Sequence, residues 1–266
     1  MYSKFNYKLN PDFYRSELKS HLSKGKELYN QFKNESQLAL KRFIYDNEEI
    51  DGTALKNHWF SINKADVFLS HSHKDDEEVK AFAGWLYNTF GLTSFIDSCS
   101  WGYCDDLLRQ IDNKYCHDAA SNTYNYKLRN YTTAHVHMML STALTEMIDH
   151  CECIIFFNTP NSIRTPNELE NIKNGHQQTK SPWIYHELSM TSMLRQQPLN
   201  RTRNVLVYGA LFESANQAPE IWYGVDKYLQ NMITLSDKHI KEWSKYSKYK
   251  GPSSLDALYE IVQEKG

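Results

Sequence analysis

Hydrophobic and polar positions follow two different periods after residue 65. Short continuous apolar runs are typical of strands buried in a parallel sheet. They are separated by longer stretches whose apolar residues recur every three or four positions, as in amphipathic helices. We therefore expect an α/β fold with a doubly wound parallel sheet, close to the flavodoxin-like strand order. The expected strands are 66–70, 92–97, 153–158 and 204–209.

The stretches between these strands predict the covering helices. In 75–90 the apolar residues fall on one helical face, and Gly91 follows where a glycine often ends a helix. Ser181 followed by Pro182 is typical of a helix start. The other expected helices are 105–116, 134–151 and the C-terminal segment 253–266, while 117–133 has the character of a polar, aromatic loop.

The first 60 residues show a helical pattern without the strand alternation. Asn10 and Pro11 suit a helix start, and two amphipathic helices are expected before a linker near Asp51 and Gly52. Gly25 is a weak point in this helical pattern. We expect a helical extension over 1–60, which either packs as an appendage or binds a partner, followed by one α/β domain over 65–266.

Composition and charge narrow the class of protein. The chain has 266 residues, 41% of them hydrophobic, which is enough for a packed core. The 30 Lys and Arg residues nearly balance the 32 Asp and Glu residues, so no nucleic-acid partner is expected. The first residues lack the apolar core of a signal peptide, and no run approaches the roughly 18 apolar residues of a membrane span. We expect a cytoplasmic protein without membrane contact.

The cysteines and histidines predict no metal site. The five cysteines match no zinc spacing, and their odd number favours reduced thiols. His135 and His137 are two positions apart on an expected helix, so they point to different faces. No metal ion or bound cofactor is therefore expected.

Three segments carry candidate chemistry. In the first, Ser70 and His71 follow the apolar strand of "ADVFLSHSHKD", where strands of open α/β sheets present ligand-binding groups. In the second, "FID" ends in Asp97 and leads into a segment with aromatic residues. The third, "SPWIYHEL", places Trp183 and Glu187 four apart on one helical face.

These three segments, in this order, resemble the Toll/interleukin-1 receptor (TIR) domain family. In that family an apolar strand ends in a Ser-His or Ser-Tyr pair, a "FID" strand leads into a mobile loop, and a Trp precedes a Glu on a later helix. The resemblance covers about residues 65–262 and leaves the first 60 residues unexplained. This chain departs from the family pattern by an enlarged segment at 98–150, with the mobile loop expected at 98–104.

The resemblance implies an enzyme that cleaves NAD at the nicotinamide–ribose bond, with NAD as substrate. It makes Glu187 the catalytic carboxylate, placed to stabilise an oxocarbenium-like transition state. Ser70, His71 and Asp97 are then expected to bind the substrate. Aromatic side chains of the same expected site are Trp101 and Tyr103, which could stack on a substrate ring or anchor their loop, and Trp183, as a site wall.

The resemblance also implies interaction partners. The chain is similar to TIR proteins of anti-phage systems such as Thoeris, in which the nucleotide product activates an effector protein. TIR enzymes of this type act as assemblies, so a homo-oligomer is expected. Two alternatives stay open: a TIR interaction module without catalysis, and a nucleoside-processing enzyme similar to the deoxyribosyltransferases.

Overall fold

A five-stranded parallel sheet forms the centre of the computed structural model, which describes residues 1–266 except 36–39, 46–47, 61–64, 165–176, 197–220 and 264–266. The strand order is β3-β2-β6-β1-β9, and every neighbouring pair is parallel. The strands are β1 (Ser3–Tyr7), β2 (Val67–Ser70), β3 (Ser94–Ile96), β6 (Cys153–Phe157) and β9 (Ile233–Leu235). The predicted strands at 66–70, 92–97 and 153–158 are confirmed, and 204–209 lies outside the described residues.

The N-terminal strand β1 corrects the predicted domain organisation. Ser3–Tyr7 lies inside the sheet, with β6 on one side and β9 on the other. The prediction that 1–60 form only a helical extension is therefore wrong. The sequence pattern does not predict this strand, because the polar residues Lys4 and Asn6 interrupt its apolar residues. Phe5 and Tyr7 are nevertheless fully buried.

The helix that follows packs closely against the domain. The chain passes through α1 (Pro11–Phe13) and two short irregular turns to α2 (Leu22–Glu35), which lies against α4 (Asp76–Phe90). Gly25 marks this crossing: a Cβ there would overlap the carbonyl of Lys80. Gly84 on α4 has the same role, because its Cβ would overlap the carbonyl of His21. Gly25 is therefore a packing contact and not simply a weak point of the helix.

The expected linker near Asp51 is instead the start of a helix. Asp51 caps α3 (Gly52–Trp59), and its carboxylate accepts a hydrogen bond of 2.9 Å from the Ala54 amide. A short 3-10 helix at Leu40–Phe43 precedes it. α3 packs against α6, so the end of this segment, like β1 at its start, folds onto the rest of the chain.

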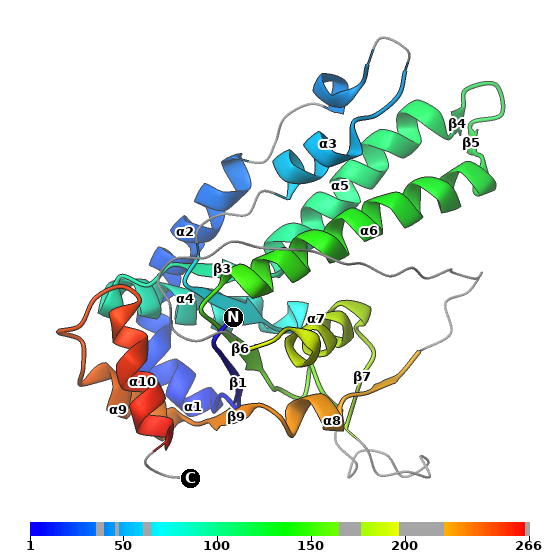
Figure 1. Ribbon diagram of the computed structural model, residues 1–266. Coiled ribbons are helices and arrows are strands. Elements are labelled where there is room, and N and C mark those ends of the chain that lie inside the picture. The colour runs from blue at the N-terminus through cyan, green and yellow to red at the C-terminus, as the bar shows by residue number, and fades with distance from the viewer. Residues whose placement is uncertain (36–39, 46–47, 61–64, 165–176, 197–220, 264–266) are drawn as a thin grey trace.

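Helices cover both faces of the sheet (Figure 1). On one face, the Phe82 ring of α4 contacts Tyr7 and Phe157, with ring centroids 5.6 and 5.3 Å away. Trp243 of α9 (Asp237–Ser244) stacks on Phe90 on this same side. The C-terminal helix α10 (Ser253–Gln263) is also there, because Tyr259 lies over Phe5.

The opposite face carries α7 (Pro182–Met193). The side chain of Lys4, which alternates with Phe5 along β1, reaches the Thr191 carbonyl of α7 over 3.3 Å. Shorter elements follow this helix or precede it: β7 (Gln178–Thr179), β8 (Tyr223–Gly224) and α8 (Asp226–Leu229). Within the described residues, the fold is therefore an α/β sheet with helices on both faces.

The segment 98–150 forms an arm of two long helices. α5 (Ser98–Tyr115) and α6 (Tyr126–His150) lie side by side and project from the sheet, joined by the hairpin β4 (His117–Asp118) and β5 (Thr123–Tyr124) (Figure 1). Asp112 joins the two helices, accepting from Arg129 at 2.9 Å and Thr132 at 2.7 Å. The expected loop at 117–133 is thus mostly hairpin and helix.

The expected mobile loop at 98–104 is also helical. Asp97 caps α5, and its carboxylate accepts a 2.8 Å hydrogen bond from the Ser98 amide. The prediction of helices at 105–116 and 134–151 is confirmed: both form the later part of a longer helix, which ends one residue earlier than expected. Among the residues described, no helix combines the length and the apolar character needed to cross a membrane.

Candidate functional site

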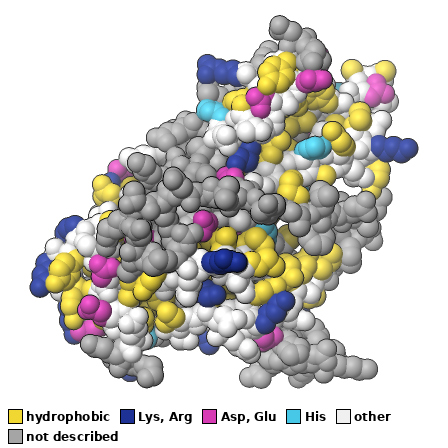
Figure 2. Space-filling view, viewed as in Figure 1, with side chains coloured by type: hydrophobic (Ala, Val, Ile, Leu, Met, Phe, Trp, Pro, Cys, Tyr) yellow, Lys and Arg dark blue, Asp and Glu magenta, His cyan; other side chains and the backbone are white. Residues whose placement is uncertain are grey.

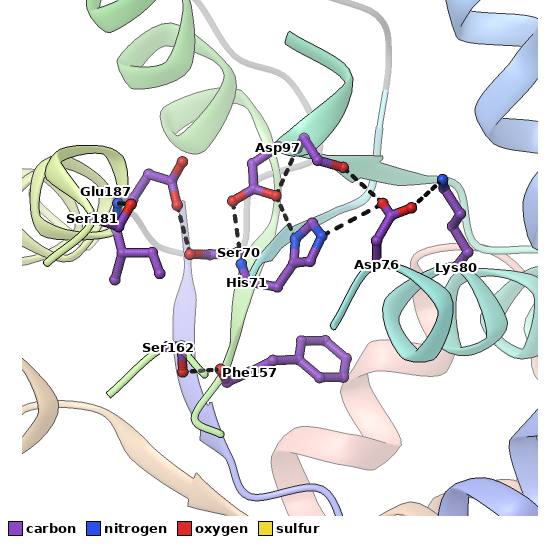
Figure 3. A network of polar contacts seen from close by, with 11 residues as sticks. Ser70, His71, Asp76, Lys80, Asp97, Phe157, Ser162, Ser181 and Glu187 are labelled. Atoms are coloured by element: carbon purple, nitrogen blue, oxygen red, sulfur yellow. Dashed lines mark hydrogen bonds and ion pairs between the residues drawn. The ribbon is translucent and has the colours of Figure 1, made fainter. Parts of the chain in front are cut away.

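The candidate site lies where β2 and β3 end. Ser70 is the last residue of β2 and His71 follows it, while Asp97 follows the last residue of β3. The two strands are parallel neighbours, so their carboxyl ends meet at one edge of the sheet. Figure 3 shows these side chains together with Glu187, which comes from α7. Segments more than 100 residues apart in the chain thus converge at one point.

Glu187 is held by Ser70. The Ser70 hydroxyl donates a 2.6 Å hydrogen bond to Oε2 of Glu187. Ser181 positions the helix that carries this glutamate, because its hydroxyl caps α7 by accepting from the Ile184 amide. Glu187 is 0% exposed, so its carboxyl is buried and not open to solvent.

His71 and Asp97 form a buried ion pair. The Nδ1 atom of His71 lies 2.5 Å from Oδ1 of Asp97, and neither side chain is exposed. The backbone amide of His71 also donates to Oδ2 of Asp97 over 3.2 Å. One carboxylate therefore binds the end of β2 through both the side chain and the backbone of His71.

Asp76 and Lys80 extend this network into α4. Oδ1 of Asp76 lies 3.8 Å from Nε2 of His71 and accepts a 3.1 Å hydrogen bond from the Ser98 hydroxyl. Oδ2 of Asp76 pairs with Lys80, one helical turn away. Charges alternate in sign along the row of Lys80, Asp76, His71 and Asp97 (Figure 3). This row links α4 to the start of α5 and to the end of β2.

The electrostatic environment shifts the pKa values of His71 and Glu187. Burial opposes the charged form of His71, but the charges of Asp97 and Asp76 and the hydrogen bonds to both outweigh it and raise its pKa to about 9. His71 is therefore an imidazolium at neutral pH. Burial, the negative charge of Asp97 and a hydrogen bond between the two carboxyl groups raise the pKa of Glu187 well above its ordinary value, although the Ser70 hydrogen bond lowers it. The site therefore favours the neutral form of Glu187 more strongly than water does.

Asp75, in the turn after β2, connects the site to the neighbouring strand β6. Its carboxylate accepts 2.6 Å hydrogen bonds from Thr159 and from Asn161, in the loop that follows β6. The side chain of Asp75 is buried, so these bonds compensate for the loss of water. The contact joins the turn after β2 to the turn after β6.

Sequence reasoning missed the structural roles of Asp75, Asp76 and Lys80. In the sequence, the run of acidic residues at 75–78 indicates only a helix start. The spacing of Asp76 and Lys80, four residues apart on a predicted helix, is the signal that indicates their pairing. No local signal indicates that His71 would lie against Asp76.

The aromatic candidates are less clearly part of the site. Trp183 is half-buried and packs edge-on against His137, with ring centroids 5.5 Å apart. It therefore joins α7 to α6. Trp101 and Tyr103 lie within α5, and their side chains are outside the described part of the structure. His73 is exposed.

Comparisons with known proteins identify no similar protein. No protein-family model, curated protein or solved structure matches this chain. In the described residues, no group of three or more His, Cys, Asp or Glu side chains is arranged to hold a metal ion. The chemistry available is that of one carboxyl with a raised pKa, one hydroxyl and one ion pair, all buried at the carboxyl ends of parallel strands.

Proposed function

We propose that this protein is a TIR-like enzyme that cleaves NAD at the nicotinamide–ribose bond, with Glu187 as the catalytic carboxylate. The observation that carries the proposal is the 2.6 Å contact between Ser70 and Glu187 beside Asp97. The three segments that resemble the TIR family supply these three residues. Their convergence at the carboxyl end of the sheet is what ligand binding in α/β folds requires.

The order of the strands supports a flavodoxin-like core in part. Taken alone, β2, β3 and β6 have the spatial order β3-β2-β6, which matches the first three strands of the flavodoxin-like order. The next position is filled by β1 from the N-terminus, which departs from that order. We propose a TIR-like unit over these three strands, completed by the N-terminal strand.

The proposed chemistry relies on Glu187 as a charge and not as a general acid. Breaking the bond between ribose and the nicotinamide nitrogen builds positive charge on the sugar. A carboxylate beside that sugar stabilises the transition state, and the pyridinium leaves without needing a proton. Ser70 orients the carboxylate through its hydrogen bond. His71 and Asp97 shape the wall of the site and bind the substrate.

We further propose that the enzyme acts as a homo-oligomer in the cytoplasm and signals in anti-phage defence, its product activating an effector protein. Exposed apolar side chains on the arm support self-association, including Tyr126, Leu128 and Tyr131 of α6. Figure 2 shows apolar side chains gathered on this arm. A groove of about 420 Å³ between α3 and α6 lies on the same arm, lined in part by Lys56, Met138 and Met139.

The direct test is incubation of the purified protein with NAD, with the products identified by mass spectrometry. Nicotinamide together with ADP-ribose, or a cyclised or conjugated form, is the expected result. Because activity can depend on a trigger, the same measurement is made in cells exposed to phage. Unchanged NAD in both settings would favour the alternative of an interaction module.

A further inference from the structure

Three ionisable side chains at the site are fully buried: His71, Asp97 and Glu187, each 0% exposed. They comprise one imidazole and two carboxyl groups. Both oxygens of Asp97 are engaged, Oδ1 by the imidazole of His71 and the Ser98 amide, and Oδ2 by the His71 amide. The single positive charge of the trio is therefore already committed to Asp97.

The two carboxyl oxygens of Glu187 differ in their hydrogen bonding. Oε2 accepts from Ser70, while Oε1 is buried and accepts no hydrogen bond from the described residues. Figure 3 shows Oε1 pointing away from Ser70. The charged pair of Asp76 and Lys80, which flanks His71 on α4, is balanced within itself. Neither of them offsets a charge on Glu187.

We infer that the site lacks one positive charge, and that a cationic ring, such as the oxidised nicotinamide of the proposed substrate, supplies it while Glu187 releases its proton to solvent. This inference rests on the proposed function for the identity of the ligand. It adds that the site selects the charge of the ring, and that ligand binding and ionisation of the catalytic carboxyl are one event.

The physical reason is the cost of placing two carboxylates beside each other without water. Burial, the charge of Asp97 and the hydrogen bond between the two carboxyl groups all favour the neutral form of Glu187 and raise its pKa. A cation that reaches Oε1 removes this penalty, since an opposite charge at close range favours the ionised carboxyl. The reduced, neutral nicotinamide ring provides no such compensation. NADH is therefore expected to be rejected even though its shape is similar.

The test uses a matched pair of small probes, 1-methylnicotinamide, which is cationic, and nicotinamide, which is neutral. The full chain is labelled with ¹³C at the glutamate carboxyls, and the Glu187 signal is assigned by its absence in Glu187→Gln. We expect a protonated Glu187 at pH 7 that ionises when 1-methylnicotinamide is added and stays protonated with nicotinamide. Calorimetry in buffers of different ionisation enthalpy should report release of about one proton.

The pH dependence provides an independent readout. Between pH 6 and 8 His71 stays charged, because its pKa is about 9. Affinity for 1-methylnicotinamide should therefore rise by up to about tenfold per pH unit as the proton becomes easier to remove, whereas affinity for nicotinamide should not change. An ionised Glu187 in the free protein, binding of the cation without proton release, or no preference for the cation would each overturn the inference.

These outcomes are separate from the proposed function. If cation-linked ionisation is observed but NAD is not cleaved, the inference holds and the proposed function fails. If NAD is cleaved by a protein whose Glu187 is ionised before the ligand binds, the function holds and the inference fails.

Discussion

At the scale of single residues, Glu187 is the group on which the proposed reaction depends. Its carboxyl is buried, has a raised pKa and accepts a hydrogen bond from Ser70. Replacing it with glutamine keeps its size and most of its hydrogen bonding while removing its capacity to become charged. The variant therefore tests charge and leaves shape nearly unchanged.

We expect Glu187→Gln to lower NAD cleavage by about a hundredfold or more, because loss of one such electrostatic contact costs roughly 3 kcal/mol. The melting temperature should change little, since a neutral amide replaces a carboxyl whose raised pKa already favours its neutral form. NAD turnover and melting temperature are measured side by side. Glu260→Gln, at an exposed position of α10, is the matched control and should retain full activity.

A folded Glu187→Gln protein with near-normal turnover would rule out the mechanism and leave the interaction module. His71→Ala should behave differently, weakening substrate affinity and rate together, because it removes a wall of the site and the partner of Asp97.

His71 also predicts how stability depends on pH. Its pKa rises from 6.5 to about 9 on folding, so the folded state binds the proton more tightly than the unfolded state. This contribution to stability is fully present below pH 6.5 and is lost as the pH rises towards 9. Because the pKa of Glu187 is also raised, the comparison is made in a Glu187→Gln background. Denaturant unfolding from pH 6 to 10 should show a decline that is absent once His71→Gln is added. Identical pH profiles for the two proteins would contradict the buried ion pair.

At the scale of elements, the crossing of α2 and α4 positions one side of the site. Backbone approaches backbone at Gly25 and Gly84, and the ammonium group of Lys80 lies over the Tyr29 ring of α2, 3.6 Å from its centroid. Lys80 in turn pairs with Asp76 beside His71. The N-terminal helix is thus in contact with the charged row of the site.

We expect Gly84→Ala to force these two helices apart, because its Cβ would overlap backbone atoms of His21 and Gly25, which cannot rotate away as side chains do. Overpacking of this kind destabilises by roughly 1–3 kcal/mol. Thermal unfolding followed by circular dichroism measures the loss. Gly224→Ala is the control, because a Cβ there meets no atom within 4 Å. Equal melting temperatures for wild type and Gly84→Ala would refute the close crossing.

At the scale of the whole molecule, the N-terminal strand β1 is an inner strand of the sheet. β1 separates β6 from β9 and pairs with both. Its Phe5 and Tyr7 rings contact α10 and α4. Removing this strand opens the middle of the sheet and exposes the core on one face.

A chain that begins at residue 10 should therefore fail to fold, whereas a detachable extension could be removed without harm. The expected result is loss of cooperative thermal unfolding and of near-ultraviolet circular dichroism. Phe5→Ala is a milder change in the same strand. It should lower the free energy of unfolding by about 3–5 kcal/mol, as for other buried aromatic rings. Its control is Lys8→Ala, at an exposed position just after the strand. A shortened chain that unfolds cooperatively would restore the idea of a separate N-terminal unit.

The sequence by itself determined the elements whose signal is local. The apolar runs of β2, β3 and β6 and the start of α7 at Ser181 follow from side-chain period and cap chemistry, which need only neighbouring residues. It also pointed to Ser70, Asp97 and Glu187, which the structure brings together.

Only the tertiary structure decided the features that depend on residues far apart in the chain. The insertion of β1, with its polar Lys4 and Asn6, is stabilised by strands more than 140 residues later. The contact of Ser98, at the start of α5, with Asp76 and the burial of Glu187 beside Ser70 likewise depend on residues far apart in the chain. Desolvation and charge proximity set protonation, and both are properties of the folded surroundings. No local pattern contains them.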